Sequence, residues 1–161
     1  MGGSNSGKST FAQQLGRITG YPVLYMDQIA HIPGSNWVRD AVEKTGAKHH
    51  EFLKRDAWII DGMYKQYLSE RLDRADTVII LRAHKFRRVW RYLRRAWRDE
   101  SNRPGNLERA EKEFNWSMVW WMLFRADYRP HFDTLKKYPH LKPIVLKSFS
   151  DMEKFLNTVS F

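Results

Sequence analysis

The sequence predicts an α/β fold in which helices cover both faces of a parallel β-sheet. Short runs of β-branched and other apolar residues alternate along the chain with longer segments whose apolar residues recur every three or four positions. That alternation is typical of parallel strands joined by crossover helices. A glycine-rich stretch, Gly2 to Thr10, stands directly before the first helical segment. A loop of this kind holds phosphate groups at a helix N-terminus, which favours the three-layer α/β/α fold of the P-loop NTPases.

Length and composition indicate a single domain, residues 1–161. A chain of 161 residues that is 42% hydrophobic and 14% aromatic can bury one substantial core. Its longest strongly apolar run, residues 118–124, is too short to span a bilayer, and the sequence does not open on a signal-peptide pattern. The chain has no cysteine, which agrees with a reducing compartment. We therefore expect a cytoplasmic protein.

The charge is strongly positive and unevenly distributed. Lys and Arg number 28 against 18 Asp and Glu, a net charge of +10, which favours an anionic partner such as a nucleotide or a nucleic acid. Nine basic residues fall between Arg82 and Arg103, where the acidic residues are Asp99 and Glu100. Several of these arginines are spaced three and four apart and share a helical face. We expect residues 82–106 to form a basic lid over phosphate groups; a nucleic-acid surface is the alternative.

Four apolar runs predict buried parallel strands, and five periodic segments predict helices. The predicted strands are residues 22–26, 57–60, 77–81 and 143–147, and the predicted helices are residues 8–19, 38–55, 85–98, 107–128 and 151–159. Gly20 and Pro22 end the first helix.

A glycine loop of this type ordinarily follows a buried strand, yet here it begins at position 2. We expect that a first strand is missing because the true start lies upstream; the alternative is that another segment fills the centre of the sheet.

The aromatic helix of residues 107–128 is expected to pack on the sheet, because residues such as Met118 and Trp121 recur at helical spacing. The alternative is that its aromatic rings stack on nucleic-acid bases beside the arginines. The aromatic side chains concerned are Phe114, Trp116, Trp120, Trp121, Phe124 and Tyr128.

The glycine loop carries the clearest chemistry. Gly2, Gly7, Lys8 and Ser9 satisfy the P-loop (Walker A) pattern G-x-x-x-x-G-K-[ST], in which backbone N–H groups wrap the phosphates, the lysine reaches the β and γ oxygens, and the hydroxyl holds Mg²⁺. We therefore predict ATP and Mg²⁺ as ligands and Lys8 as a catalytic residue. The predicted ATP-binding residues are Gly2, Gly3, Ser4, Asn5, Ser6, Gly7, Lys8, Ser9 and Thr10.

Two aspartates follow predicted strands. Asp61 ends an apolar strand, as does the acid that reaches Mg²⁺ from the neighbouring strand in P-loop proteins, and it is the second predicted metal ligand beside Ser9; a simple Asp-Gly turn is the alternative. Asp27 follows the strand of residues 22–26, where open α/β sheets bind ligands. It is predicted to bind the substrate and to orient or deprotonate an attacking hydroxyl; a loop or helix-capping aspartate is the alternative.

From end to end, the chain resembles the adenylate-kinase-like P-loop kinases, and most closely the topology modulation proteins, often called FlaR-type. The resemblance rests on GGSNSGKSTFAQQLG at the start, VLYMD followed by Trp37, WIIDGMY at residues 58–64, RLDRADTVIIL at residues 71–81, Arg91 and Arg95, Arg103-Pro104, FNW at residues 114–116, and Arg129-Pro130.

The resemblance implies a five-stranded parallel sheet and catalytic contacts from Arg91 and Arg95 to the phosphates. It also implies that Trp37 and Arg129 bind the substrate together with Asp27 and Asp61. Adenylate kinases read D-G-x-P-R where this chain has residues 61–65 as DGMYK, so AMP is not the expected acceptor.

Together these features predict a small-molecule kinase that moves the γ-phosphate of ATP to the hydroxyl or phosphate of a small acceptor. A nucleotide-dependent nucleic-acid-binding protein that affects DNA topology is the second hypothesis. An ATPase without a small-molecule acceptor is the third.

Overall fold

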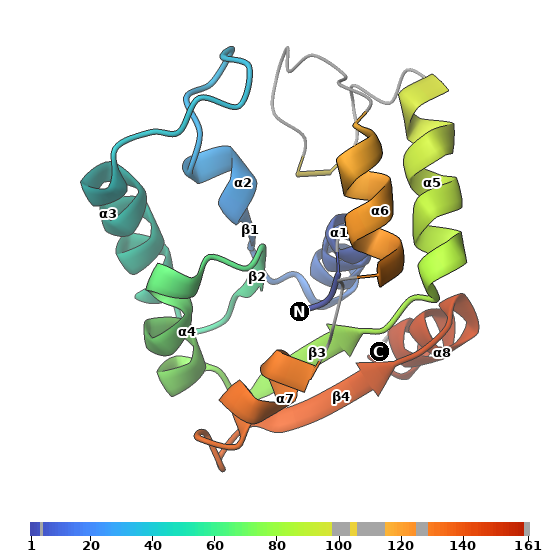
Figure 1. Cartoon of the computed structure of the whole chain (residues 1–161). Helices are drawn as coiled ribbons and strands as arrows, with labels where there is room; N and C mark the ends of the chain where they lie inside the picture. The colour runs from blue at the N-terminus through green and yellow to red at the C-terminus, as the bar shows by residue number, and fades with distance from the viewer. Residues whose placement is uncertain (4, 98–103, 106–114, 125–128, 160–161) are drawn as a thin grey trace.

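The computed structural model describes residues 1–3, 5–97, 104–105, 115–124 and 129–159, with only the backbone described at residues 87, 95–97, 121–122 and 129–131. The strands are β1 (Val23–Tyr25), β2 (Ile59–Asp61), β3 (Thr77–Leu81) and β4 (Lys142–Leu146). The helices are α1 (Lys8–Thr19), α2 (Met26–Ile29), α3 (Val42–Leu53), α4 (Leu68–Arg74), α5 (Lys85–Trp97), α6 (Trp116–Phe124), α7 (Arg129–Leu135) and α8 (Phe149–Val159), with a 3₁₀ turn, η1, at Lys65–Tyr67 (Figure 1).

The fold is mixed α/β with parallel strands, but the described strands form two pairs instead of the continuous sheet predicted from the sequence. β1 pairs with β2, with Val23 beside Ile59 and Tyr25 beside Asp61. β3 pairs with β4, from Thr77 beside Lys142 to Leu81 beside Leu146. All four strands lie within about two residues of their predicted positions.

The first residues of the chain lie along β3. The N-terminal amino group of Met1 donates a hydrogen bond to the carbonyl of Ile79, and the N–H of Leu81 donates to the carbonyl of Met1 at 2.9 Å. Gly2 forms an isolated parallel bridge with Leu81. The glycine loop therefore starts from the carboxyl-terminal end of β3.

The β3–β4 pair is covered on both faces, because alternate residues of a strand point to opposite sides. Leu81 and Leu146 pack with Phe11 of α1 and with Met152 and Leu156 of α8. On the other face, Val78 and Ile80 pack with Leu72 of α4, with Leu135 of α7 and with Leu141. α1 also contacts β1 and β2 and so joins the two strand pairs.

Glycines set both ends of α1. Gly7 precedes the helix with φ 93° and Gly20 follows it with φ 73°, left-handed conformations that glycine adopts without strain. Thus α1 begins at Lys8, as predicted.

Several helices differ from prediction. The helix predicted over residues 38–55 begins at Val42, because the preceding segment folds back and pairs His31 with Arg39 in an antiparallel bridge. The short helices α2, α4 and α7 were not predicted, since four to seven residues are too few to show a periodic pattern. Met26, predicted to end a strand, begins α2.

The prediction that the aromatic helix packs in the core is wrong for its described aromatic side chains. Trp116, Trp120 and Phe124 are 73%, 55% and 68% exposed, whereas Val119 is buried. α6 contacts α5, and its sequence WSMVWWMLF is apolar around most of its circumference, so that packing on one side leaves large side chains in solvent. The side chain of Trp121, together with Phe114, Tyr128 and the rest of residues 107–114, lies outside the description.

None of the helices in the described parts of the chain combines the length and the apolar character that a membrane-crossing helix needs.

Candidate phosphate-binding site

The loop before α1 has an unusual backbone. Asn5 has φ 60° and Gly7 has φ 93°, so residues with positive φ stand on both sides of Ser6; left-handed residues of this kind occur in anion-binding nests. Ser6 lies between them, fully buried, and its hydroxyl has no hydrogen-bond partner among the described residues. Thr10 is exposed in the first turn of α1, and Ser4 lies outside the described residues. The loop therefore offers a backbone cradle at a helix N-terminus.

The Lys8 side chain folds back over this cradle. Its Nζ donates a hydrogen bond to the carbonyl of Gly3 at 2.8 Å. Burial lowers the pKa of Lys8, the negative charges of Asp61 and Asp27 act in the opposite direction, and the positive charge of Arg88 lowers it further. One ammonium group thus lies within the electrostatic reach of two carboxylates and one guanidinium.

Ser9 and Asp61 meet directly. The Ser9 hydroxyl donates to Asp61 Oδ2 at 2.6 Å, which joins the first turn of α1 to the end of β2. Both residues supply oxygen, the donor atom that Mg²⁺ prefers, and Mg²⁺ commonly takes only one or two protein oxygens and fills its remaining positions with water and substrate phosphates. The described residues contain no cluster of three or more His, Cys, Asp or Glu side chains that could hold a metal ion.

A turn from the predicted lid reaches the same place. A Cβ atom built on Gly105 would lie 3.2 Å from the Ser9 hydroxyl and 3.0 Å from the Tyr25 ring. Gly105 also has φ 70°. The Pro104–Gly105 turn therefore lies beside Ser9 and Tyr25.

Two arginines of α5 lie on the loop glycines. A Cβ atom built on Gly7 would lie 3.0 Å from Arg91 Nη1, and the Arg91 guanidinium also lies 5.0 Å from the centre of the Phe149 ring. Arg88 was not among the predicted site residues. Its side chain is 1% exposed, and a Cβ atom built on Gly3 would lie 2.6 Å from Arg88 Cζ. Arg88 stands three residues before Arg91 and so shares its helical face, and this spacing could have identified Arg88 as a candidate from the sequence. Arg95 lies on α5, but its side chain is not described.

Asp27 lies in the first turn of α2, and its negative charge acts on Lys8. The Tyr64 hydroxyl donates to Asp27 Oδ1 at 2.7 Å, and burial together with the negative charge of Asp27 raises the pKa of Tyr64. Tyr64 was not predicted as a site residue. Since Tyr25 pairs with Asp61 in the sheet, Asp27 and Tyr64 leave from the ends of neighbouring strands.

Among the described contacts, Trp37 is linked to Asp27 through His31. The Trp37 and His31 rings meet edge to face at 5.3 Å, and His31 Nδ1 lies 2.8 Å from the Asp27 carbonyl. Because a carbonyl only accepts hydrogen bonds, Nδ1 carries the proton. Arg129 begins α7, and only its backbone is described.

Arg71 stabilises the chain after β2. It is buried and donates to the carbonyls of Gly62 at 2.7 Å, Tyr64 at 3.3 Å and Tyr67 at 3.3 Å. Burial lowers its pKa to about 10 while the charge of Asp61 acts in the opposite direction, so that Arg71 remains cationic at neutral pH. These three bonds hold the segment that carries Tyr64.

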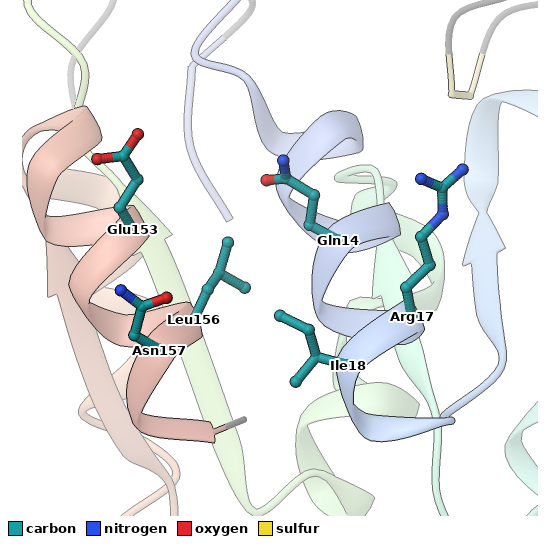
Figure 2. Close-up of a pocket in the computed structure, with 6 residues that line it drawn as sticks. All are labelled: Gln14, Arg17, Ile18, Glu153, Leu156 and Asn157. Atoms are coloured by element: carbon teal, nitrogen blue, oxygen red, sulfur yellow. The ribbon is translucent and has the colours of Figure 1, made fainter. Parts of the chain in front are cut away.

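A separate groove of about 420 Å³ opens between α1 and α8. Figure 2 shows Ile18 and Leu156 facing each other across it, with Gln14, Glu153 and Asn157 near its edges. None of the predicted site residues lines this groove.

Comparisons of the chain with protein-family models, with curated proteins and with solved structures found no match in any of the three. A functional assignment therefore depends on the residues and the geometry described above.

Proposed function

We propose that the protein is a P-loop phosphotransferase that binds Mg²⁺–ATP at residues 2–10 and moves its γ-phosphate to a small acceptor. The observation that carries the proposal is the hydrogen bond between Ser9 and Asp61. It links a glycine loop with a Lys-Ser pair to a carboxylate at the end of β2. P-loop enzymes use these parts to hold the phosphates and their metal ion.

In this proposal, the side chains around the loop bind the phosphates, hold the metal ion or supply positive charge. Lys8 and the loop N–H groups bind the phosphates, Ser9 and Asp61 hold the metal ion, and Arg88 and Arg91 supply positive charge from α5 as the phosphoryl group moves. When bound, Mg²⁺ neutralises charge on the β and γ oxygens. Phosphoryl transfer depends on such positioning and charge, which these residues can provide without a covalent intermediate.

A binding and transfer experiment tests the proposal. We expect Mg²⁺-dependent ATP binding by calorimetry and transfer of label from γ-labelled ATP to a member of a panel of nucleosides, nucleotides and small metabolites. Lys8→Ala should lose both, whereas Lys137→Ala, a change at an exposed lysine of the chain, should lose neither. Unchanged ATP affinity in Lys8→Ala contradicts the proposal. Steady hydrolysis with no labelled product from any compound would favour an ATPase without an acceptor.

The exposed aromatic and basic residues of α5 and α6 support a second candidate function, nucleotide-dependent binding of nucleic acid. Trp90 is 59% exposed, and the Arg94 guanidinium lies 5.1 Å from its ring centre. Exposed aromatic rings beside arginines are a common base-stacking arrangement. Affinity for a labelled oligonucleotide should then fall by orders of magnitude between about 50 and 200 mM salt if about six or more phosphates are contacted. No binding at low salt excludes this function.

A further inference from the structure

We infer that Tyr64 is a positioning residue that orients Asp27 to take a proton from a hydroxyl group, so that the phosphate acceptor is a hydroxyl compound and not a nucleoside monophosphate. This inference rests on the proposed kinase function and names the substrate class of the same site. It concerns the residues at the carboxyl ends of β1 and β2.

The first step is the placement of the carboxylate. β1 and β2 are neighbours and parallel, so their carboxyl ends meet at one edge, where Asp61 ends β2 and Asp27 follows β1 by two residues. Both charges act on Lys8. The charge of Asp27 thus reaches the lysine that the proposal places on the β and γ phosphates.

The second step is the orientation of that carboxylate. The Tyr64 hydroxyl holds Oδ1 at 2.7 Å, while Oδ2 accepts no hydrogen bond from the described residues. Asp27 is exposed, so Oδ2 is accessible to an incoming group. Because the pKa of Tyr64 is raised, its hydroxyl stays protonated and remains a donor at neutral pH. A fixed Oδ1 leaves Oδ2 as the oxygen that can accept a proton, as a general base requires.

The third step is the charge on the acceptor side. A monophosphate acceptor would bring negative charge next to Asp27 and Asp61, and it needs a cation to compensate, typically a bidentate arginine. Arg71 is buried, and three of its five N–H groups donate to backbone carbonyls of the chain after β2. Arg39 is an exposed cation whose charge acts on Tyr64. Its backbone forms an isolated antiparallel bridge with His31. Arg39 suits an anionic group on a more distant part of the acceptor. A neutral hydroxyl, in contrast, gains a hydrogen bond from Asp27.

The resulting step balances. The acceptor oxygen forms a bond to the γ-phosphorus, and the bond between that phosphorus and the β–γ bridging oxygen breaks. The hydroxyl proton passes to Asp27 Oδ2 and then to solvent. ATP and R–OH therefore give ADP, R–O–phosphate and one proton.

Slow hydrolysis of Mg²⁺–ATP tests the positioning role without knowledge of the natural acceptor, because water also presents a hydroxyl to Asp27. In the full chain, Tyr64→Phe should lower kcat for hydrolysis by roughly tenfold or more, since a hydrogen bond to a charged group is lost. KM for ATP should stay within about twofold, because the Tyr64 hydroxyl bonds Asp27, which the proposal assigns to the acceptor. Tyr21→Phe, at an exposed tyrosine after α1, should change neither value.

The outcomes separate this inference from the proposed function. Equal kcat values for Tyr64→Phe and the unmodified chain would overturn the positioning role. A KM for ATP that rises in step with the loss of kcat would also overturn it. So would the absence of ATP hydrolysis by the unmodified chain when ATP is bound. Conversion of any nucleoside monophosphate to its diphosphate by the unmodified chain overturns the hydroxyl assignment but leaves the proposed kinase function intact. Failure to bind Mg²⁺–ATP removes both.

Discussion

Arg88 and Arg94 belong to the same basic helix but have opposite surroundings. Arg88 is buried against Gly3 of the loop, whereas Arg94 is exposed on α5 and lies over the Trp90 ring. Sequence spacing alone did not show which arginines of this helix are buried. Their different burial predicts that they contribute unequally to phosphate chemistry.

Replacing each arginine with methionine, which keeps most of the side-chain volume, tests that difference. We expect Arg88→Met to lower kcat for ATP turnover by about tenfold to a thousandfold, because a cation aimed at developing charge is lost. Arg94→Met should stay within about twofold. Turnover and thermal unfolding should be measured on both variants, and equal losses of turnover would argue against a special role for Arg88.

His49 is a fully buried ionisable side chain whose surroundings lead to a prediction about the pH dependence of stability. Its ring packs on Tyr67 with centroids 5.2 Å apart, and its Nδ1 lies 3.2 Å from Glu70 Oε2. Burial lowers the pKa of His49, the positive charge of Arg71 lowers it further, and Glu70 acts in the opposite direction. His49 is therefore neutral in the folded protein near pH 7.

A histidine whose pKa is lowered by folding takes up its proton more readily in the unfolded chain, so that acid favours unfolding. Stability from His49 is present above its unfolded pKa of 6.5 and is lost as the pH falls through the lower folded value. Urea midpoints at pH 7.5 and 5.5 should therefore differ less in His49→Gln than in the unmodified chain. An unchanged pH response in His49→Gln would refute the assignment.

At the scale of elements, two helices contain an interior glycine with different surroundings. Gly16 of α1 faces β1, and a Cβ atom there would lie 2.4 Å from Val23 Cγ2 and 3.0 Å from the Tyr21 carbonyl. Gly46 of α3 has room, since a Cβ atom would meet only the Tyr67 ring, at 3.5 Å. Gly16 is therefore required for helix–strand packing, whereas Gly46 only weakens its helix.

Alanine at the two positions should have effects of opposite sign. Gly46→Ala should raise the free energy of unfolding by about 0.5–1 kcal/mol through helix propensity. Gly16→Ala should lower it by about 1–3 kcal/mol, because α1 must move away from a β-branched side chain on a strand. Denaturant titrations of both variants measure this difference, and stabilisation by Gly16→Ala would show that α1 is not packed closely on β1.

The elements also show where sequence patterns were sufficient. The strands and α1 were placed nearly correctly, because long apolar runs and glycine boundaries are local signals. The outward-facing aromatic side chains of α6 were not foreseen, because helical spacing shows which residues share a face but not whether another element covers that face.

At the scale of the whole molecule, the loop connects parts that are distant in sequence. The first residues lie on β3, Ser9 bonds Asp61 of β2, Arg88 and Arg91 approach from α5, and Gly105 contacts Ser9. A ligand in the loop would therefore stabilise several elements together.

Thermal unfolding tests that linkage. A ligand at about one hundred times its Kd stabilises a protein by about 2.7 kcal/mol. For a chain of this size that corresponds to a rise in Tm of roughly 5–10 °C. We expect this rise with Mg²⁺–ATP, a much smaller one when the metal is chelated, and none in Lys8→Ala. A similar rise in the Lys8 variant would place the nucleotide elsewhere.

The sequence by itself determined the α/β class, the strand positions and the residues of the glycine loop, because each depends on neighbours along the chain. The tertiary structure decided that Ser9 meets Asp61, that Arg88 lies on Gly3, that Tyr64 holds Asp27, and that the described strands form two pairs. These features join segments up to about 85 residues apart, as Gly3 and Arg88 are. Such contacts depend on how helices and strands pack in space, which no local pattern of residues encodes.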